Sequence, residues 1–268
     1  MKAVFLTSTF RRHAHVANHL AARCDLRGVW QETKSFEPQR YSASPEDDAV
    51  IRTHFEARDR SEAEYFAGDG RLTLASDTVH RLVDAGGCSE CGEVEVMRRL
   101  EPDVVLVFGT GILRDPLLST FAGRIINIHL GLSPYYRGAG TNFWPLVNRE
   151  PEYVGATIHY LDAGIDTGAM IAHVRPGIAP GDGPHDIGNK TIAAAAQLLG
   201  HAAEAHVRGR VQPVPQQGRG RLYQRKDFSA DAVRRLYRHF ETNMIEEYLA
   251  DRARRDAAVR LVELPEAV

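Results

Sequence analysis

An uninterrupted apolar run, "DVVLVFG" (103–109), constrains the fold of this chain most strongly. A strand that is apolar at every position is typical of a parallel sheet with helices on both faces, because neither face then meets water. Strands that alternate with helices indicate an open α/β sheet. Four other segments follow this alternation: a strand at 2–8, a helix at 11–24, a strand at 25–30 and a strand at 124–129.

The rest of the chain extends the same pattern. Helical spacing occurs at 45–68 and 185–209, and strands are predicted at 154–161 and 169–178. We therefore predict an α/β domain with a Rossmann-like, mainly parallel open sheet over residues 1–209.

A Pro/Gln/Gly-rich break at 210–222 separates this region from a helical segment at 229–256, for which Ser229 is a plausible N-cap. We predict a small, mostly helical C-terminal extension over residues 210–268. Its apolar face either docks on the same chain or makes a homodimer contact.

Charge and cysteine content exclude several classes of protein. The chain has 268 residues, with 33 Lys+Arg against 35 Asp+Glu, so the molecule as a whole carries no basic footprint for nucleic acid or a membrane surface. The first apolar run is too short for a signal peptide, and we expect a soluble, cytoplasmic protein. Cys88 and Cys91 have the spacing of half a zinc site, but no second pair completes it; we expect spare thiols on a polar loop and no metal.

Two polar side chains interrupt the apolar strand at 124–129. Because side chains alternate in a strand, Asn127 and His129 point to the same face. Burying an amide and an imidazole without partners costs roughly 1–3 kcal/mol per group, so the pair either ties strand ends together or meets a ligand. Ligands in open α/β sheets bind beyond the carboxyl ends of strands, which favours a site here.

The loop "LDAGIDTG" (161–168) supplies a carboxylate, Asp166, that could orient His129 and favour its charged form. Asp166 could equally be a turn residue in a glycine-rich loop. An Asn-His-Asp constellation suits acyl transfer without a protein nucleophile, since the amide and imidazolium stabilise an oxyanion while the carboxylate manages a proton. No G-x-S-x-G motif supports a serine hydrolase.

Two segments, "NIHLGLSPYYRG" (127–138) and "GATIHYLDAGIDTGAMI" (155–171), resemble the hallmark pair of the folate-dependent formyltransferases that act on glycinamide ribonucleotide, methionyl-tRNA or amino sugars. The resemblance implies that Asn127, His129 and Asp166 are catalytic, that N10-formyltetrahydrofolate is the donor and that an amine is the acceptor. It also implies a donor pocket made of Gly109, Thr110, Gly111, Ile112, Leu113, Asp162, Ala163 and Gly164.

This sequence departs from the family pattern at several positions, among them the segment "GTNFW" (140–144), which replaces a more common version that contains proline. Leu130 and Gly131 stand where proline and serine are usual, and Gly111 stands where the family often has a long side chain. These changes affect the expected acceptor and the shape of the donor pocket more than the catalytic trio.

The acceptor is predicted from residues around the same edge of the sheet. Arginines at the start of the first helix can attract phosphate, and nearby aromatic rings can stack on a base or sugar, which favours an amino-sugar nucleotide. The residues assigned to this role are Arg11, Arg12, Tyr135, Tyr136, Arg137 and Trp144. The arginines could instead be ordinary surface charges, and the aromatic residues could cover the core.

Other functions stay open. The acceptor could be another small amine, such as a modified amino acid, or methionyl-tRNA, although that branch of the family carries a basic C-terminal barrel. A formyl-folate hydrolase, or a non-catalytic folate- or nucleotide-binding module, would use the same cleft.

Overall fold

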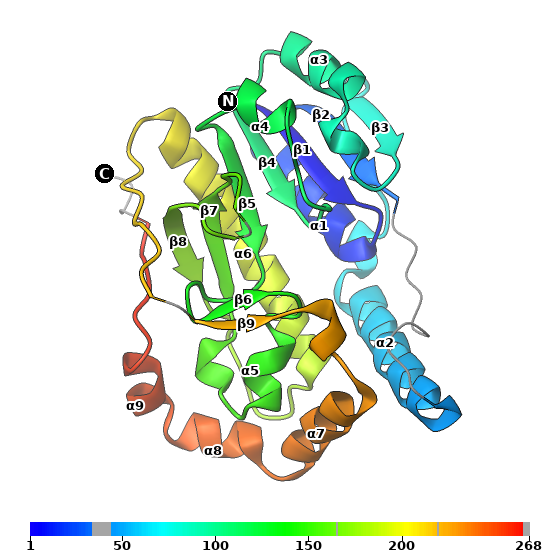
Figure 1. The fold of residues 1–268 in the computed structure, drawn as a ribbon, viewed down its shortest axis with the longest axis vertical. Helices are drawn as coiled ribbons and strands as arrows, with labels where there is room; N and C mark the ends of the chain where they lie inside the picture. Colours follow the sequence, from blue (N-terminus) through cyan, green and yellow to red (C-terminus); the bar gives the residue numbers. More distant parts are fainter. Residues whose placement is uncertain (34–43, 165, 219, 265–268) are drawn as a thin grey trace.

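The computed structural model describes residues 1–33, 44–164, 166–218 and 220–264. Within these residues the centre of the fold is a seven-stranded sheet with the order β3-β2-β1-β4-β5-β7-β8 (Figure 1). β1 to β5 pair in parallel, whereas β7 is antiparallel to both of its neighbours, so the predicted mainly parallel sheet is confirmed. The strands are β1 (Lys2–Ser8), β2 (Asp25–Glu32), β3 (Val79–Val83), β4 (Val104–Phe108), β5 (Ile125–His129), β7 (Ala156–Tyr160) and β8 (Met170–Val174).

Helices cover the sheet on both faces. On one face, α1 (Arg11–Ala21) and α6 (Pro184–Val207) pack on alternate residues such as Ile126 and Ile128 of β5. On the other face, α3 (Cys91–Arg99) and α4 (Leu117–Thr120) pack on β1, β4 and Ile125. Ile125 and Asn127 are separated by one residue, so the face that carries α3 and α4 is also the face on which the polar residues of β5 lie.

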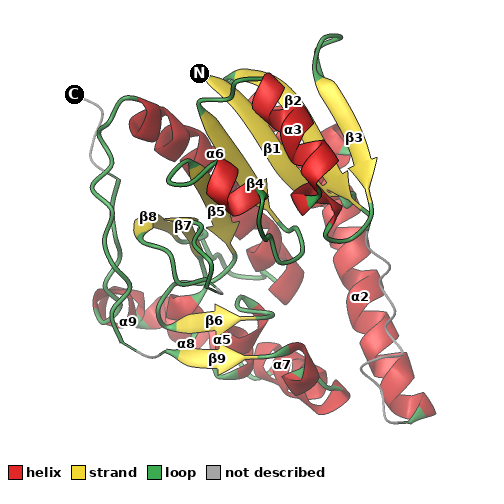
Figure 2. Cartoon of the chain, turned by 45° about the horizontal axis from the view of Figure 1, so that its top comes forward, coloured by secondary structure: helices red, strands yellow, loops and turns green. Residues whose placement is uncertain are grey.

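The region between β2 and β4 contains two elements of different kinds. The helix predicted at 45–68 is found as α2 (Pro45–Tyr65), whose start is capped by the Ser44 hydroxyl accepting from the Asp47 amide. It extends along α6 and α7 and projects beyond the sheet (Figure 2). Strand β3 was not predicted, because it lies at the sheet edge with exposed side chains and has no apolar run.

The C-terminal extension differs from the single helix predicted at 229–256. It forms α7 (Ala230–Glu241), α8 (Met244–Ala250) and α9 (Arg252–Ala257). The backbone of Asn243 is left-handed, with φ of 57°, which ends the first helix and turns the chain. The remaining short elements are α5 (Phe143–Val147), β6 (Tyr136–Gly138), β9 (Arg221–Tyr223) and the 3₁₀ turns Ala67–Asp69, Gly87–Ser89, Pro151–Tyr153 and Arg225–Asp227.

The extension packs on the rest of the chain at several places. Its apolar residues Leu236, Ile245 and Tyr248 join one buried cluster with α5 residues, which is the intramolecular docking considered from the sequence. β9 also pairs in parallel with β6 (Figure 1). A boundary at residue 209 and a homodimer both stay predictions. No helix among the described residues is long and apolar enough to cross a bilayer.

Candidate active site

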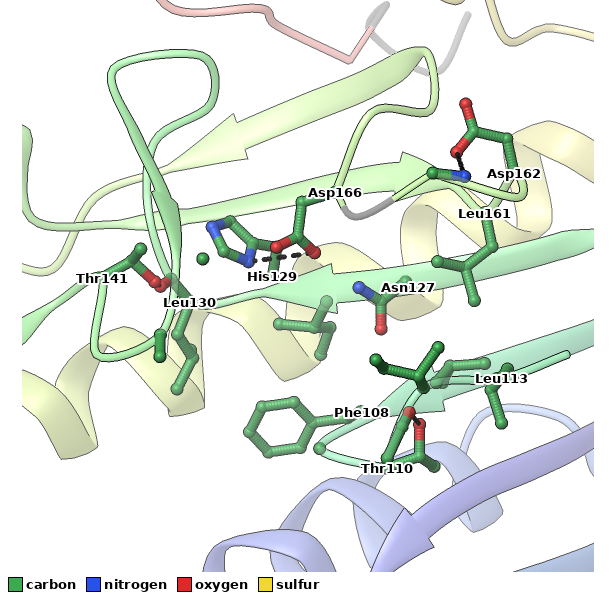
Figure 3. Close-up of a pocket in the computed structure, with 18 of the residues that line it drawn as sticks. Phe108, Thr110, Leu113, Asn127, His129, Leu130, Thr141, Leu161, Asp162 and Asp166 are labelled. Carbon is green, nitrogen blue, oxygen red and sulfur yellow. Dashed lines mark hydrogen bonds and ion pairs between the residues drawn. The ribbon is translucent and has the colours of Figure 1, made fainter. Parts of the chain in front are cut away.

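The face of β5 next to α4 opens into a cavity of about 540 Å³ (Figure 3). Asn127 and His129 line it, and Asp166 reaches it from the loop between β7 and β8. The structure therefore brings the three predicted catalytic residues together, while their catalytic role stays a prediction. All eight residues predicted for the donor pocket also line the cavity: Gly109, Thr110, Gly111, Ile112, Leu113, Asp162, Ala163 and Gly164.

His129 lies between two acceptors. Its Nδ1 is 3.4 Å from Asp166 Oδ1, and its Nε2 is 3.3 Å from the carbonyl oxygen of Tyr136. Both ring nitrogens of His129 therefore face oxygen atoms that can accept a hydrogen bond. Burial raises the pKa of Asp166, but the hydrogen bond and charge of His129 and the Gly138 amide outweigh it and hold that pKa below its usual value. The pair is therefore suited to hold a proton next to the cavity.

A residue that the sequence interpretation missed, His159, orients Asn127. The Asn127 Nδ2 group donates to His159 Nε2 at 3.0 Å, and His159 Nδ1 donates to the Tyr160 carbonyl at 2.8 Å. Burial, followed by the nearby His129, lowers the pKa of His159 to about 4, which keeps its ring neutral. Asn127 uses one of its two amide N–H groups on His159, so the second is available to a ligand.

Glu32, at the end of β2, holds the loop after β4. Its side chain is fully buried and accepts hydrogen bonds from the Gly111 amide at 2.6 Å and from the Gly86 amide at 3.1 Å. A Cβ at Gly111 would lie 3.2 Å from Glu32 Oε2. Gly111, which departs from the family pattern, therefore allows the Glu32 carboxylate to approach the loop backbone. The sequence did not predict this contact.

Gly131, the second departure, also has a structural reason. Its φ is 153°, and a Cβ there would lie 2.6 Å from Thr141 Cβ and 2.9 Å from His129 Nε2. The Thr157 hydroxyl donates to the Gly131 carbonyl at 2.6 Å and accepts from the Ser133 amide at 2.9 Å. The loop after β5 is thus tied to β7 with its backbone close to the imidazole.

None of the six residues predicted to bind the acceptor lines this cavity: Arg11, Arg12, Tyr135, Tyr136, Arg137 and Trp144. Arg12 forms an ion pair with Glu62 of α2, and burial lowers its pKa. Tyr136 and Trp144 are buried, and Trp144 stacks on Tyr223 with ring centroids 4.2 Å apart. These contacts match the alternative in which the aromatic residues cover the core.

The loop after β6 also lines the cavity. Thr141, Asn142 and Phe143 follow the Gly-Ala-Gly turn after β6. Asn142 also accepts from the Gly155 amide at 3.1 Å through its side-chain oxygen, which fixes the loop to the start of β7. The sequence did not identify Thr141, Asn142 and Phe143 as cavity residues, because a mixture of polar and aromatic residues is ordinary in a short loop.

The structure offers no metal centre within the residues it describes. No group of three or more His, Cys, Asp or Glu side chains there could hold an ion. Cys88 is buried in the core beneath α3, which corrects the expectation of a thiol on a polar loop, whereas Cys91 is exposed.

Comparison with known proteins matches the centre of the chain to one family. A family model described as formyl transferase matches residues 73–202. The methionyl-tRNA formyltransferase of Trichlorobacter lovleyi is 35% identical over 124 residues, which cover 46% of this chain and 39% of that protein. That of Myxococcus xanthus is 32% identical over 127 residues, covering 47% and 40% respectively. The match thus spans less than half the length of these curated relatives.

Solved structures share the fold at low sequence identity. A 4-N formyltransferase from Francisella tularensis has a TM-score of 0.55 with 16% identity, covering 85% of this chain and 78% of that one. A phosphoribosylglycinamide formyltransferase from Streptococcus pneumoniae has a TM-score of 0.52 with 19% identity, covering 77% and 99%. An N-formyltransferase from Helicobacter canadensis, solved with folinic acid and dTDP-3-aminofucose, has a TM-score of 0.51 with 16% identity, covering 85% and 72%. Residues 73–202 are therefore similar to the formyl transferase family in sequence, and the chain shares its fold with solved formyltransferases.

Proposed function

We propose that this protein transfers a formyl group from N10-formyltetrahydrofolate to a primary amine. The observation that carries the proposal is the convergence of Asn127, His129 and Asp166 on one cavity, whose other wall is the loop at 109–113. The formyl transferase family model that matches residues 73–202 and the folinic acid bound by the Helicobacter canadensis enzyme support the same donor.

The cavity has the composition that a pterin ring requires. Its volume lies within the roughly 300–1,000 Å³ usual for small-molecule sites. Val107, Leu113, Leu118 and Leu161 supply apolar walls, while the backbone at 109–113 offers amide and carbonyl groups at the edge. A flat heterocycle with polar edges fits such a lining, because its faces pack on the apolar side chains and its edges bond to the backbone.

In the proposed reaction a neutral amine attacks the formyl carbon. The second N–H of Asn127 and the positive charge on His129 stabilise the oxyanion that develops on the formyl oxygen. The Asp166 carboxylate accepts the proton that the amine loses, directly or through water, and the His129–Asp166 pair returns a proton to the leaving nitrogen. The carbon–nitrogen bond to the donor then breaks, and no protein nucleophile takes part.

For the acceptor we propose an amino-sugar nucleotide. This choice is supported by the dTDP-3-aminofucose bound by the Helicobacter canadensis enzyme. Methionyl-tRNA is the second candidate, because the curated relatives with 32–35% identity are named methionyl-tRNA formyltransferases.

The test is a formyl-transfer assay with the purified protein, N10-formyltetrahydrofolate and a panel of amino-sugar nucleotides, small amines and methionyl-tRNA. Release of tetrahydrofolate together with a formylated product in the mass spectrum identifies the acceptor. Calorimetry with 5-formyltetrahydrofolate measures the donor site separately. Donor binding without turnover on any acceptor would favour the folate-binding module, and absence of both would overturn the proposal.

A further inference from the structure

A short segment of the C-terminal extension runs beside the loop that carries Asp166. Val214 and Met170 form an antiparallel bridge in which each amide donates to the other's carbonyl at 2.8 Å. Two residues further on, Gln216 Nε2 lies 2.8 Å from the Asp166 carbonyl and 2.8 Å from the Gly168 carbonyl. A primary amide nitrogen carries two N–H groups, so this one atom satisfies both carbonyls.

The backbone at Asp166 needs such support. Its φ of 51° lies in the left-handed region, which residues other than glycine adopt uncommonly and Asp more readily than most. A conformation of this kind persists only where the surroundings determine it. On the β7 side, a Cβ at Gly168 would lie 1.7 Å from the Tyr160 carbonyl oxygen, so the loop already fits closely against that strand. Gln216 fixes the opposite side.

We propose that Gln216 is a positioning residue for Asp166. By holding the main chain of Asp166 and Gly168, its amide sets the direction in which the Asp166 carboxylate points toward His129, with which it pairs at 3.4 Å. This role rests on the proposed formyl transfer, in which that carboxylate moves the proton. Gln216 does not line the cavity, so it acts through Asp166 and not on a substrate.

A purely structural role would have different consequences. Gln216 is partly exposed, and both Pro215 and Gln217 beside it are exposed, so the segment contributes little to the core. Loss of its amide should therefore leave the folded state intact and change the geometry of one carboxylate. Three variants separate these effects: Gln216→Ala removes the donors, Gln216→Glu places a carboxylate against two carbonyls, and Gln217→Glu introduces the same charge one residue away.

The kinetic test uses the full-length chain with N10-formyltetrahydrofolate and the acceptor found in the panel. We expect kcat to fall about 10- to 100-fold in both Gln216 variants, the scale on which small misplacements of reacting groups act. The KM for the donor and the thermal midpoint should match the wild type, and Gln217→Glu should behave as the wild type. In an Asp166→Asn background, Gln216→Glu should cost little further activity, because the two residues act through one group.

A second readout does not need turnover. In NMR spectra, the ring resonances of His129 are assigned by their loss in His129→Asn, and we expect Asp166→Asn to shift them. Gln216→Ala should shift the same resonances in the same direction, and Gln217→Glu should not.

The outcomes divide cleanly. The assignment is wrong if both Gln216 variants keep the wild-type kcat. It is also wrong if Gln216→Glu lowers kcat as much in the Asp166→Asn background as in the wild type, or if Gln216→Ala leaves the His129 resonances unshifted. If the wild type transfers no formyl group to any acceptor, the proposed function fails, and the His129 resonances still decide whether Gln216 positions Asp166.

Discussion

Asn127 and His159 face each other across β5 and β7, with Asn127 Nδ2 3.0 Å from His159 Nε2. The Tyr160 carbonyl accepts from His159 Nδ1, so Nε2 is left as an acceptor and can bind only the NH₂ end of the amide. This relationship fixes which end of Asn127 carries donors near the cavity, and it makes a fully buried histidine part of the support of the site.

His159 therefore offers a test of amide orientation. His159→Leu removes the acceptor, which frees Asn127 to rotate, and we expect kcat to fall about 10- to 100-fold because a reacting group is no longer held in place. His159→Gln can accept through its side-chain oxygen and should recover part of the rate. Single-turnover rates, compared with thermal unfolding of both variants, measure the effect; a wild-type rate in the Leu variant would contradict the assignment.

Asn127→Asp keeps the shape of the side chain but removes both donors. We expect kcat to fall about 100- to 1,000-fold, the usual cost of losing one oxyanion donor. Binding of 5-formyltetrahydrofolate should persist in calorimetry, because the loop at 109–113 remains. Equal losses of binding and rate would instead indicate that Asn127 binds the donor without acting on the reaction.

Glu32→Gln tests the support of the loop after β4. A neutral amide can accept on one atom only, so one of the Gly86 and Gly111 amides loses its partner. We expect the free energy of unfolding to fall by about 1–3 kcal/mol, as for a buried hydrogen bond to a charged group. The KM for the donor should rise more than kcat falls. Glu90→Gln, on an exposed side chain near the same loops, is the control and should change neither quantity.

Stability should decrease in acid in part because of a buried cluster between α2, α6 and α7. His54 and His185 both contact the Tyr237 hydroxyl, at 3.1 and 3.2 Å. Burial, together with neighbouring positive charge, lowers the pKa of His54 to about 3 and that of His185 to about 4. Both rings are neutral above the unfolded pKa of about 6.5, so the free energy of unfolding is unaffected there.

As the pH falls below that value, the unfolded chain takes up protons that the folded chain excludes. The free energy of unfolding then decreases, down to about pH 4 for His185 and about pH 3 for His54, by up to roughly 1.4 kcal/mol per pKa unit for each group. Urea unfolding at a series of pH values measures the slope. His185→Asn should flatten it, whereas His201→Gln, on the exposed side of α6, should leave it unchanged.

The parts of the site that the sequence predicted are those set by local pattern. Alternation in β5 placed Asn127 and His129 on one face, and a carboxylate in a glycine-rich loop pointed to Asp166. His159 and Glu32 act through contacts 32 and 79 residues away, which depend on strand register and on the close approach of loops. No periodicity within a segment encodes such distances, so neither residue could be identified from the sequence.

Contacts between residues far apart in the sequence also explain why the residues predicted to bind the acceptor do not line the cavity. Arg12 was interpreted from its position at a helix start, yet its partner is Glu62, 50 residues away on α2. The break at Asn243 depends on one left-handed residue within a continuous amphipathic pattern, and the pattern predicts the packed face correctly but not the break. That the six residues assigned to the acceptor contact it stays a prediction.

Because β9 pairs with β6, the C-terminal extension cannot be exchanged independently of the rest of the chain. The strand Arg221–Tyr223 joins the strand that leads into the cavity loop at 139–143, and Gln216 lies just before it in sequence. A chimaera joined at residue 209, made to transplant acceptor preference from a homologue, would replace the partner of β6 and the support of Asp166 in one step. Recombination at this point would therefore alter turnover together with selectivity, and crossovers after residue 223 would be the ones that preserve the reaction.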